Sequence, residues 1–195
     1  MRFLAKGLVC LPLAFGPSFA MAADLSGLRV SDQRFIPSGF EVRLGAFAHG
    51  VASAERDTVD INLEVVLPRV FPAAPGWLNY LIPRPYVGGM VNLSGRTSSL
   101  RGGALWQYDV TERFFAEGFF GGAVHDGSIN GGVNQNALGS RYLFNIGASL
   151  GYRFDSRWSA MVTFDHLSNG NSSLGTGFTR NRGINNYGAR IAYSF

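Results

Sequence analysis

The sequence predicts an all-β protein, an eight-stranded antiparallel transmembrane β-barrel, and three observations support this fold class. Apolar residues recur at every second position over stretches of about ten residues, as in residues 142–152, which is typical of strands. Charged residues such as Asp60 and Glu64 share the other face of these strands and suit a small wet or ion-paired lumen. The apolar face is rich in aromatic residues, as a membrane-interface girdle is, and the last strand ends in Phe195. A soluble β-sandwich shows the same alternation, but these three features together favour the barrel.

The composition excludes several other classes of protein. The chain has 195 residues, enough for one domain, with 46% apolar residues, 26 glycines, 16 phenylalanines and one cysteine. This apolar content argues against disorder, and a single thiol excludes a disulfide scaffold. No run of about 18 apolar residues occurs beyond the N-terminus, which excludes a helical membrane bundle.

The N-terminus has the pattern of a secretory signal peptide. Arg2 and Lys6 precede an apolar stretch over residues 7–19, and Ala20-Met21-Ala22 then offers a signal-peptidase site. We therefore expect a signal peptide over residues 1–22 and a barrel domain over residues 23–195. The net charge of +4 is weak evidence for a nucleic-acid partner, and export argues against one. All cations after Lys6 are arginines, whose planar fork suits the phosphates of lipid headgroups.

The alternation defines the expected strands and the links between them. Strands are predicted near residues 39–50, 58–68, 85–94, 100–110, 114–125, 141–154, 157–169 and 185–195. With both termini periplasmic, very short links fall on the periplasmic side at 111–113 and 155–157, and longer links fall outside at 51–57, 95–99, 126–140 and 170–184. The longer segment 69–84 is the exception on the periplasmic side, where its prolines and aromatic residues predict an apolar patch at the inner interface.

The seventh predicted strand carries polar residues on its lipid-facing side. Its outward face reads Trp158, Ala160, Val162 and Phe164, and then continues with His166 and Ser168 at the outer end. An ionisable side chain on a lipid face is costly and indicates function. Asn185 starts the next strand with the parity of its outward residues. We therefore expect His166, Ser168 and Asn185 to meet at the outer rim.

These residue types suit nucleophilic catalysis. A serine requires a general base within hydrogen-bond reach, and residues two apart on one strand face lie about 6.6 Å apart at Cα. The second imidazole nitrogen needs a partner that fixes the tautomer, which the Asn185 carbonyl can supply. Asn169 and Gly170 follow the serine and can supply oxyanion donors from side chain or backbone.

The segment from Phe164 to Gly170, together with Gly183-Ile184-Asn185 and the aromatic C-terminal strand, resembles the PagL lipid A 3-O-deacylase family. The resemblance implies an outer-membrane barrel of a Gram-negative bacterium that hydrolyses an ester-linked 3-hydroxyacyl chain of lipopolysaccharide. It implies His166 as base, Ser168 as nucleophile and Asn169 as part of the oxyanion hole. The best-known family pattern has a Glu where this chain has Asn185, so we expect Asn185 to take the place of the acidic residue.

The sequence also allows an alternative function and predicts structural roles for the remaining polar residues. A non-enzymatic small barrel of the OmpX-like type, with a degenerate motif, is the competing hypothesis, and a homodimer is left open. His49 and His125 are expected to form hydrogen bonds at the rim, and Asp165 to pair with an arginine in the lumen. No His/Cys cluster of metal-binding spacing occurs, so neither a metal nor another cofactor is expected.

Overall fold

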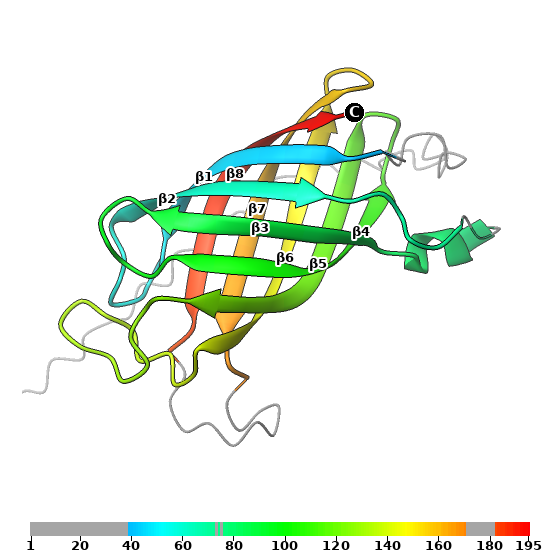
Figure 1. Ribbon diagram of the computed structural model, residues 1–195. Helices are drawn as coiled ribbons and strands as arrows, with labels where there is room; N and C mark the ends of the chain where they lie inside the picture. Colours follow the sequence, from blue (N-terminus) through cyan, green and yellow to red (C-terminus); the bar gives the residue numbers. More distant parts are fainter. Residues whose placement is uncertain (1–38, 73, 75, 171–181) are drawn as a thin grey trace, which may run out of the picture.

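The chain folds into a closed β-barrel in the computed structural model, which describes residues 39–72, 74, 76–170 and 182–195 (Figure 1). Each strand pairs antiparallel with the next, and β1 pairs with β8 to close the ring. The predicted signal peptide, residues 1–22, lies outside the described residues. Among the described parts, no helix is both long and apolar enough to cross a membrane. The elements are β1 (Glu41–His49), β2 (Thr58–Val66), the 3-10 helix η2 (Gly76–Leu81), β3 (Arg84–Asn92), β4 (Ser99–Asp109), β5 (Phe114–His125), β6 (Tyr142–Arg153), β7 (Trp158–Ser168) and β8 (Ile184–Ser194).

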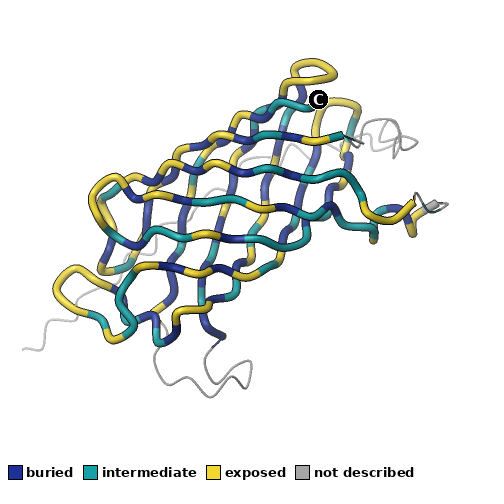
Figure 2. The backbone as a smooth tube through the Cα atoms, viewed as in Figure 1, coloured by how far each residue is buried: buried dark blue, intermediate teal, exposed yellow. Residues whose placement is uncertain are grey.

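Exposed and buried residues alternate along every strand, as the period of two requires (Figure 2). Leu150 and Val162 are 65% and 62% exposed and face outward, whereas Asp60 and Glu64 are buried in the lumen. A sandwich would have placed the apolar set on a common buried face. The predicted barrel, with apolar side chains outside and charges inside, is therefore confirmed.

The lumen is filled by ion pairs and aromatic rings. Arg43 is fully buried and binds Glu41, Glu64 and Glu117, the last at 2.7 Å. The expected pairing of Asp165 with an arginine is also present, since the Arg101 guanidinium binds its carboxylate. Because side chains occupy the interior, as is usual for eight strands, the barrel is a packed core and no open pore.

Two inward glycines of β6 explain part of the high glycine content. A Cβ on Gly147 would collide with the ring of Phe119, and a Cβ on Gly151 with the ring of Phe115. Both rings come from β5, where they are buried among the lumen side chains. The glycines of β6 therefore leave the space that the inward phenylalanines of β5 occupy.

The two ends of the barrel differ in their connections. We call the end with residues 110–113, 154–157 and the C-terminus the turn end, and the end with residues 50–57, 93–98 and 126–141 the loop end. Ser168 at the end of β7 and Ile184 at the start of β8 lie at the loop end (Figure 1).

The long connection between β2 and β3 is attached to the outside of β4 at the turn end. The rings of Tyr80 and Tyr108 stack at 4.5 Å, and Trp106 Nε1 donates to the Leu81 carbonyl at 3.0 Å. The connection exposes apolar side chains, as expected for a patch at this end. They are Val70, Phe71, Trp77, Leu78 and Leu81.

Candidate active site

The outward row of β7 ends in His166 and Ser168. Asp165 and Leu167, the residues that flank His166, are buried on the lumen side, which fixes His166 and Ser168 on the outward face. Both are half-buried, unlike Val162 lower on the same row, which is exposed. The strand thus carries two polar side chains to the loop end at the rim of an apolar surface.

The register of β7 and β8 brings Asn185 to His166. The two residues are directly paired, and Nδ1 of His166 lies 2.6 Å from Oδ1 of Asn185. An amide oxygen accepts hydrogen bonds, so Nδ1 donates and Nε2 is left as the basic nitrogen. This is the tautomer in which an imidazole can accept a proton from a serine hydroxyl at Nε2.

Gly183 lies beside the free edge of this imidazole. Its φ of +58° favours glycine, and a Cβ there would lie 3.0 Å from Cε1 and 3.7 Å from Nε2 of His166. Any larger residue would strain the backbone and crowd the basic nitrogen. No role for Gly183 was predicted from the sequence, although its place in the Gly-Ile pair before Asn185 was a signal for one.

Ser168 shares the face of His166 but makes no hydrogen bond with it among the described residues. It is paired across to Phe144 of β6, and its hydroxyl lies on the side away from the lumen. Hydrogen bonds between a nucleophile and its base are often loose before a substrate binds. The structure therefore joins His166 to Asn185 directly and places Ser168 two residues further along the same row.

Asn169 and Gly170, the predicted oxyanion donors, are both buried at the end of β7. The Asn169 amide group donates to the Leu138 carbonyl at 2.8 Å, so one of its N–H groups is engaged there. Gly170 has a φ of +76°, a turn conformation that favours glycine. The two residues follow Ser168 directly, with the Asn169 side chain directed to the loop at residues 126–141.

That loop supports both strands of the site. Asn136 donates its side-chain N–H to the Gly183 carbonyl at 3.2 Å, and the Arg182 N–H donates to the Ala137 carbonyl at 3.2 Å. With the Asn169–Leu138 bond, residues 136–138 thus contact the end of β7 and the start of β8. From the sequence, this segment was predicted only to be an outer loop.

Glu55 holds the supporting loop to its neighbours. It is buried, and its carboxylate accepts from the backbone N–H of Asn136 at 2.8 Å and of Thr97 at 3.0 Å, and from His49 Nε2 at 3.1 Å. Burial alone would raise the pKa of Glu55, but these hydrogen bonds lower its pKa to about 2. We call Glu55 and Asn136 the loop clamp, because they connect three loops with the start of β8.

The other two histidines have the expected rim positions. His49 bridges Asp60 at 2.7 Å and Glu55 at 3.1 Å, and His125 Nε2 lies 2.6 Å from the Ser140 carbonyl. Neither lies on the outward face of β7. In the part of the chain that the structure describes, no three His, Cys, Asp or Glu side chains are grouped to hold a metal ion.

The sequence matches one family model, described as Lipid A 3-O-deacylase (PagL), over residues 92–194. This range contains β4 to β8 and all the predicted site residues.

The chain belongs to the PagL lipid A 3-O-deacylase family.

The comparison with solved structures agrees with the fold. The crystal structure of the outer membrane enzyme PagL is similar with a TM-score of 0.62 and 20% identity, over 80% of this chain and 99% of that one. A structure titled "De novo design of transmembrane beta-barrels" is similar with a TM-score of 0.53 and 16% identity, over 82% of this chain and 98% of that one. No curated protein matches the chain. At such identities these likenesses concern the barrel, and the family assignment rests on the sequence model.

Proposed function

We propose that this chain is a serine esterase of the outer membrane that removes an ester-linked 3-hydroxyacyl chain from the 3-position of lipid A. The observation that carries the proposal is the His166–Asn185 pair beside Ser168, on the apolar outward face of the barrel. A site on this face suits a substrate that never leaves the membrane. Family membership supports the substrate class, and the exposed apolar girdle supports the location. No cofactor is required, and a homodimer remains a prediction.

In this mechanism Ser168 is the nucleophile and His166 the general base. The Ser168 oxygen attacks the ester carbonyl carbon while its proton passes to Nε2 of His166. The C–O bond to the sugar then breaks, and the imidazolium returns the proton to the departing sugar oxygen. Water, deprotonated by Nε2, attacks the acyl-serine ester, the Ser168 oxygen recovers a proton, and the 3-hydroxy fatty acid is released.

Asn185 and the residues after Ser168 complete the proposed machinery. Asn185 holds the imidazole with Nε2 free, but its neutral amide gives the imidazolium no full countercharge. The N–H groups of Asn169 and Gly170 stabilise the oxyanion of the tetrahedral intermediate. One side-chain N–H of Asn169 is engaged at the Leu138 carbonyl.

The test is mass spectrometry of lipid A incubated with the wild-type protein and with Ser168→Ala. We expect the wild type to release one 3-hydroxyacyl chain and the variant to release none, while both keep heat-modifiable mobility in gels. Ser159→Ala, on the lumen side of the same strand, is the matched control for a lost hydroxyl and should retain cleavage. Unchanged cleavage by Ser168→Ala would remove this serine from the mechanism.

The competing function is a non-enzymatic barrel that carries a degenerate motif. Two observations favour it: Asn185 lacks a carboxylate, and the described residues show no hydrogen bond between Ser168 and His166. Lipid A that is unchanged by a folded wild-type protein would support this alternative.

A further inference from the structure

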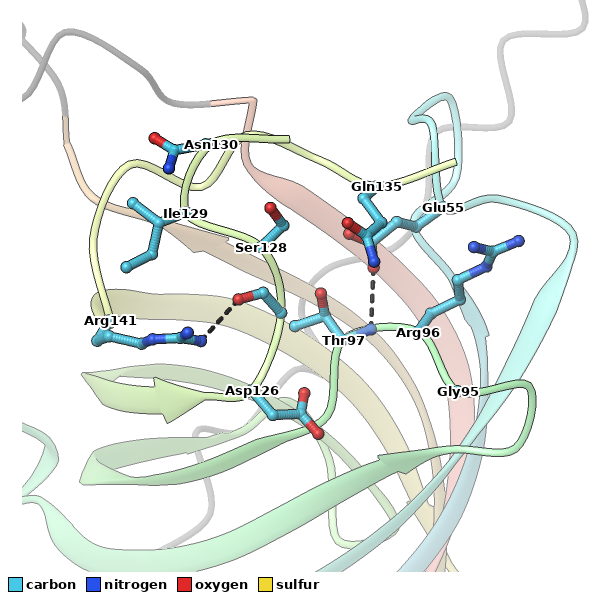
Figure 3. Close-up of a pocket in the computed structure, with 11 residues that line it drawn as sticks. Glu55, Gly95, Arg96, Thr97, Asp126, Ser128, Ile129, Asn130, Gln135 and Arg141 are labelled. Atoms are coloured by element: carbon cyan, nitrogen blue, oxygen red, sulfur yellow. Dashed lines mark hydrogen bonds between the residues drawn. The ribbon is translucent and has the colours of Figure 1, made fainter. Parts of the chain in front are cut away.

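A polar hollow of about 460 Å³ opens at the loop end, and no residue of β7 is part of its lining (Figure 3). It lies between residues 93–98 and residues 126–141, and this volume is within the range of small-ligand sites. In Figure 3, Arg141 and Arg96 lie on opposite sides of the lining, with Ser128 and Thr97 between them. We call it the loop-end hollow. Its lining is Glu55, Gly95, Arg96, Thr97, Asp126, Gly127, Ser128, Ile129, Asn130, Gln135 and Arg141.

The two arginines of the hollow differ from the arginines of the lumen. Arg43, Arg101 and Arg190 each bind a carboxylate, whereas Arg96 and Arg141 form no salt bridge with any described residue. Their contacts are with backbone carbonyls. These are Arg96 to Asn134 at 2.9 Å, and Arg141 to Gly127 at 2.7 Å and to His125 at 3.4 Å. Both guanidinium groups are thus held in place by carbonyl groups, and no carboxylate of a described residue neutralises their charge.

The acids at the hollow are engaged elsewhere. Asp126 accepts from the Ser98 N–H at 2.7 Å, and Glu55 accepts from His49 and two backbone N–H groups. Arg96 Nε is also buried without a hydrogen-bond partner among the described residues. A buried donor without a partner costs free energy, which an acceptor in the hollow would recover. The arrangement therefore offers two unneutralised guanidinium groups to an anion.

The neutral residues of the lining narrow the class of ligand. Ser128, Asn130 and Gln135 supply hydroxyl and amide groups, which can both donate to and accept from sugar hydroxyls. A guanidinium binds a phosphate or carboxylate through two parallel hydrogen bonds. A ligand would use both kinds of donor if its anionic groups bound the arginines and its sugar hydroxyls bound the amides.

We propose that the loop-end hollow binds a saccharide that bears phosphate or carboxylate groups, as part of the lipopolysaccharide molecule whose lipid A is held at Ser168. This rests on the proposed function, since the hollow and the end of β7 lie at the same end of the barrel. Glu55 links the two sites: it lines the hollow beside Thr97, and its carboxylate also holds Asn136, which binds the Gly183 carbonyl.

The first experiment measures binding without catalysis. Ser168→Ala protein in detergent is titrated by calorimetry with a fully deacylated lipopolysaccharide oligosaccharide. It is also titrated with the same oligosaccharide after removal of its phosphates and reduction of its carboxylates. We expect only the anionic form to bind, and Arg96→Gln or Arg141→Gln to weaken binding about tenfold, as for one lost charge-assisted hydrogen bond. Arg56→Gln removes an exposed charge at the same end outside the hollow and should change nothing.

The second experiment tests whether the bound saccharide belongs to the substrate. With active protein, Arg96→Gln and Arg141→Gln should raise KM for lipopolysaccharide with its saccharide core about tenfold and leave KM for lipid A alone unchanged. Arg141→Lys keeps the positive charge and replaces Arg141→Gln in the experiment if the glutamine variant does not fold. We expect it to raise KM for lipopolysaccharide by less than tenfold. Binding of the oligosaccharide without any deacylation would uphold the hollow and contradict the proposed function. Equal binding of both oligosaccharide forms, or no effect of the arginine variants on binding, would overturn the inference. An equal rise of KM for lipid A alone would also overturn it.

Discussion

Nδ1 of His166 and Oδ1 of Asn185 lie 2.6 Å apart across the β7–β8 register. The contact fixes the orientation of the ring and leaves Nε2 toward the edge where Gly183 has no side chain. An amide dipole stabilises an imidazolium less than a carboxylate does. The site thus has the geometry of a base and its orienting partner, with a weaker electrostatic contribution from the partner.

Replacing Asn185 by Glu or Asp should therefore increase the deacylation rate, by about a hundredfold, because the imidazolium gains a countercharge. Asn185→Ala should lower the rate, because nothing then holds the ring. Initial rates in mixed micelles compare the four proteins. Equal rates in all four would show that Asn185 does not orient His166.

Gly183→Ala should reduce kcat about a hundredfold, because the new methyl group displaces His166 from Ser168. The left-handed backbone adds a strain of about 1–2 kcal/mol. Gly95→Ala is the matched control, since Gly95 also has a positive φ of +71° but has nothing within 4 Å of its Cβ position. If both variants lose the same activity on lipid A, backbone strain and not crowding of His166 is responsible.

The loop clamp should make the loop end acid-sensitive. The folded pKa of Glu55 is about 2 against an ordinary value of 4.5, so its contribution is fully present above about pH 4.5. The contribution, about 3 kcal/mol, is lost as the pH falls through 2. The protection factor of the Asn136 N–H, its exchange rate relative to the intrinsic rate at the same pH, should therefore fall between pH 4.5 and 2 in the wild type.

Glu55→Gln provides the comparison for this titration. Its amide cannot accept from His49, Thr97 and Asn136 as strongly as a carboxylate, so the protection factor of the Asn136 N–H should be low already at pH 7 and change little with acid. An acid response of the same size in this variant would show that Glu55 is not the group responsible.

Gly151→Ala should destabilise the barrel by about 1–3 kcal/mol, because the methyl group enters the space of the Phe115 ring. Gly118→Ala, on β5, has nothing within 4 Å of its Cβ position and should leave stability nearly unchanged. Urea unfolding followed by tryptophan fluorescence measures both. A similar loss in the two variants would indicate that strand propensity, and not filling of the lumen, sets the cost.

The strands could be predicted from the sequence because a period of two is a local signal. All sixteen predicted strand ends lie within two residues of the observed ones, and the outward parity of His166, Ser168 and Asn185 follows from the same count. The pairing of His166 with Asn185 was predictable for the same reason, since adjacent antiparallel strands with matching parity bring such residues together.

The loop contacts could not be predicted in this way. The Glu55–Asn136 hydrogen bond joins residues 81 positions apart, in segments without hydrophobic periodicity. No repeating pattern in the sequence therefore predicts it. The crowding at Gly183 depends on the path of the chain into β8, which also lies outside the alternation. The alternation thus predicted the positions of the proposed site residues, but not the loop contacts that hold them.

Asn185 is held from both sides of β8, and this links the site to the order in which the chain is assembled. Its side chain faces β7, while its backbone carbonyl accepts from the Val51 N–H just beyond β1 at 2.8 Å. The second contact exists only when the last strand has met the first. A chain whose first and last strands are not yet paired carries every proposed site residue but lacks this support. In the proposed mechanism, the orientation of His166 by Asn185 is therefore complete only once the barrel has closed.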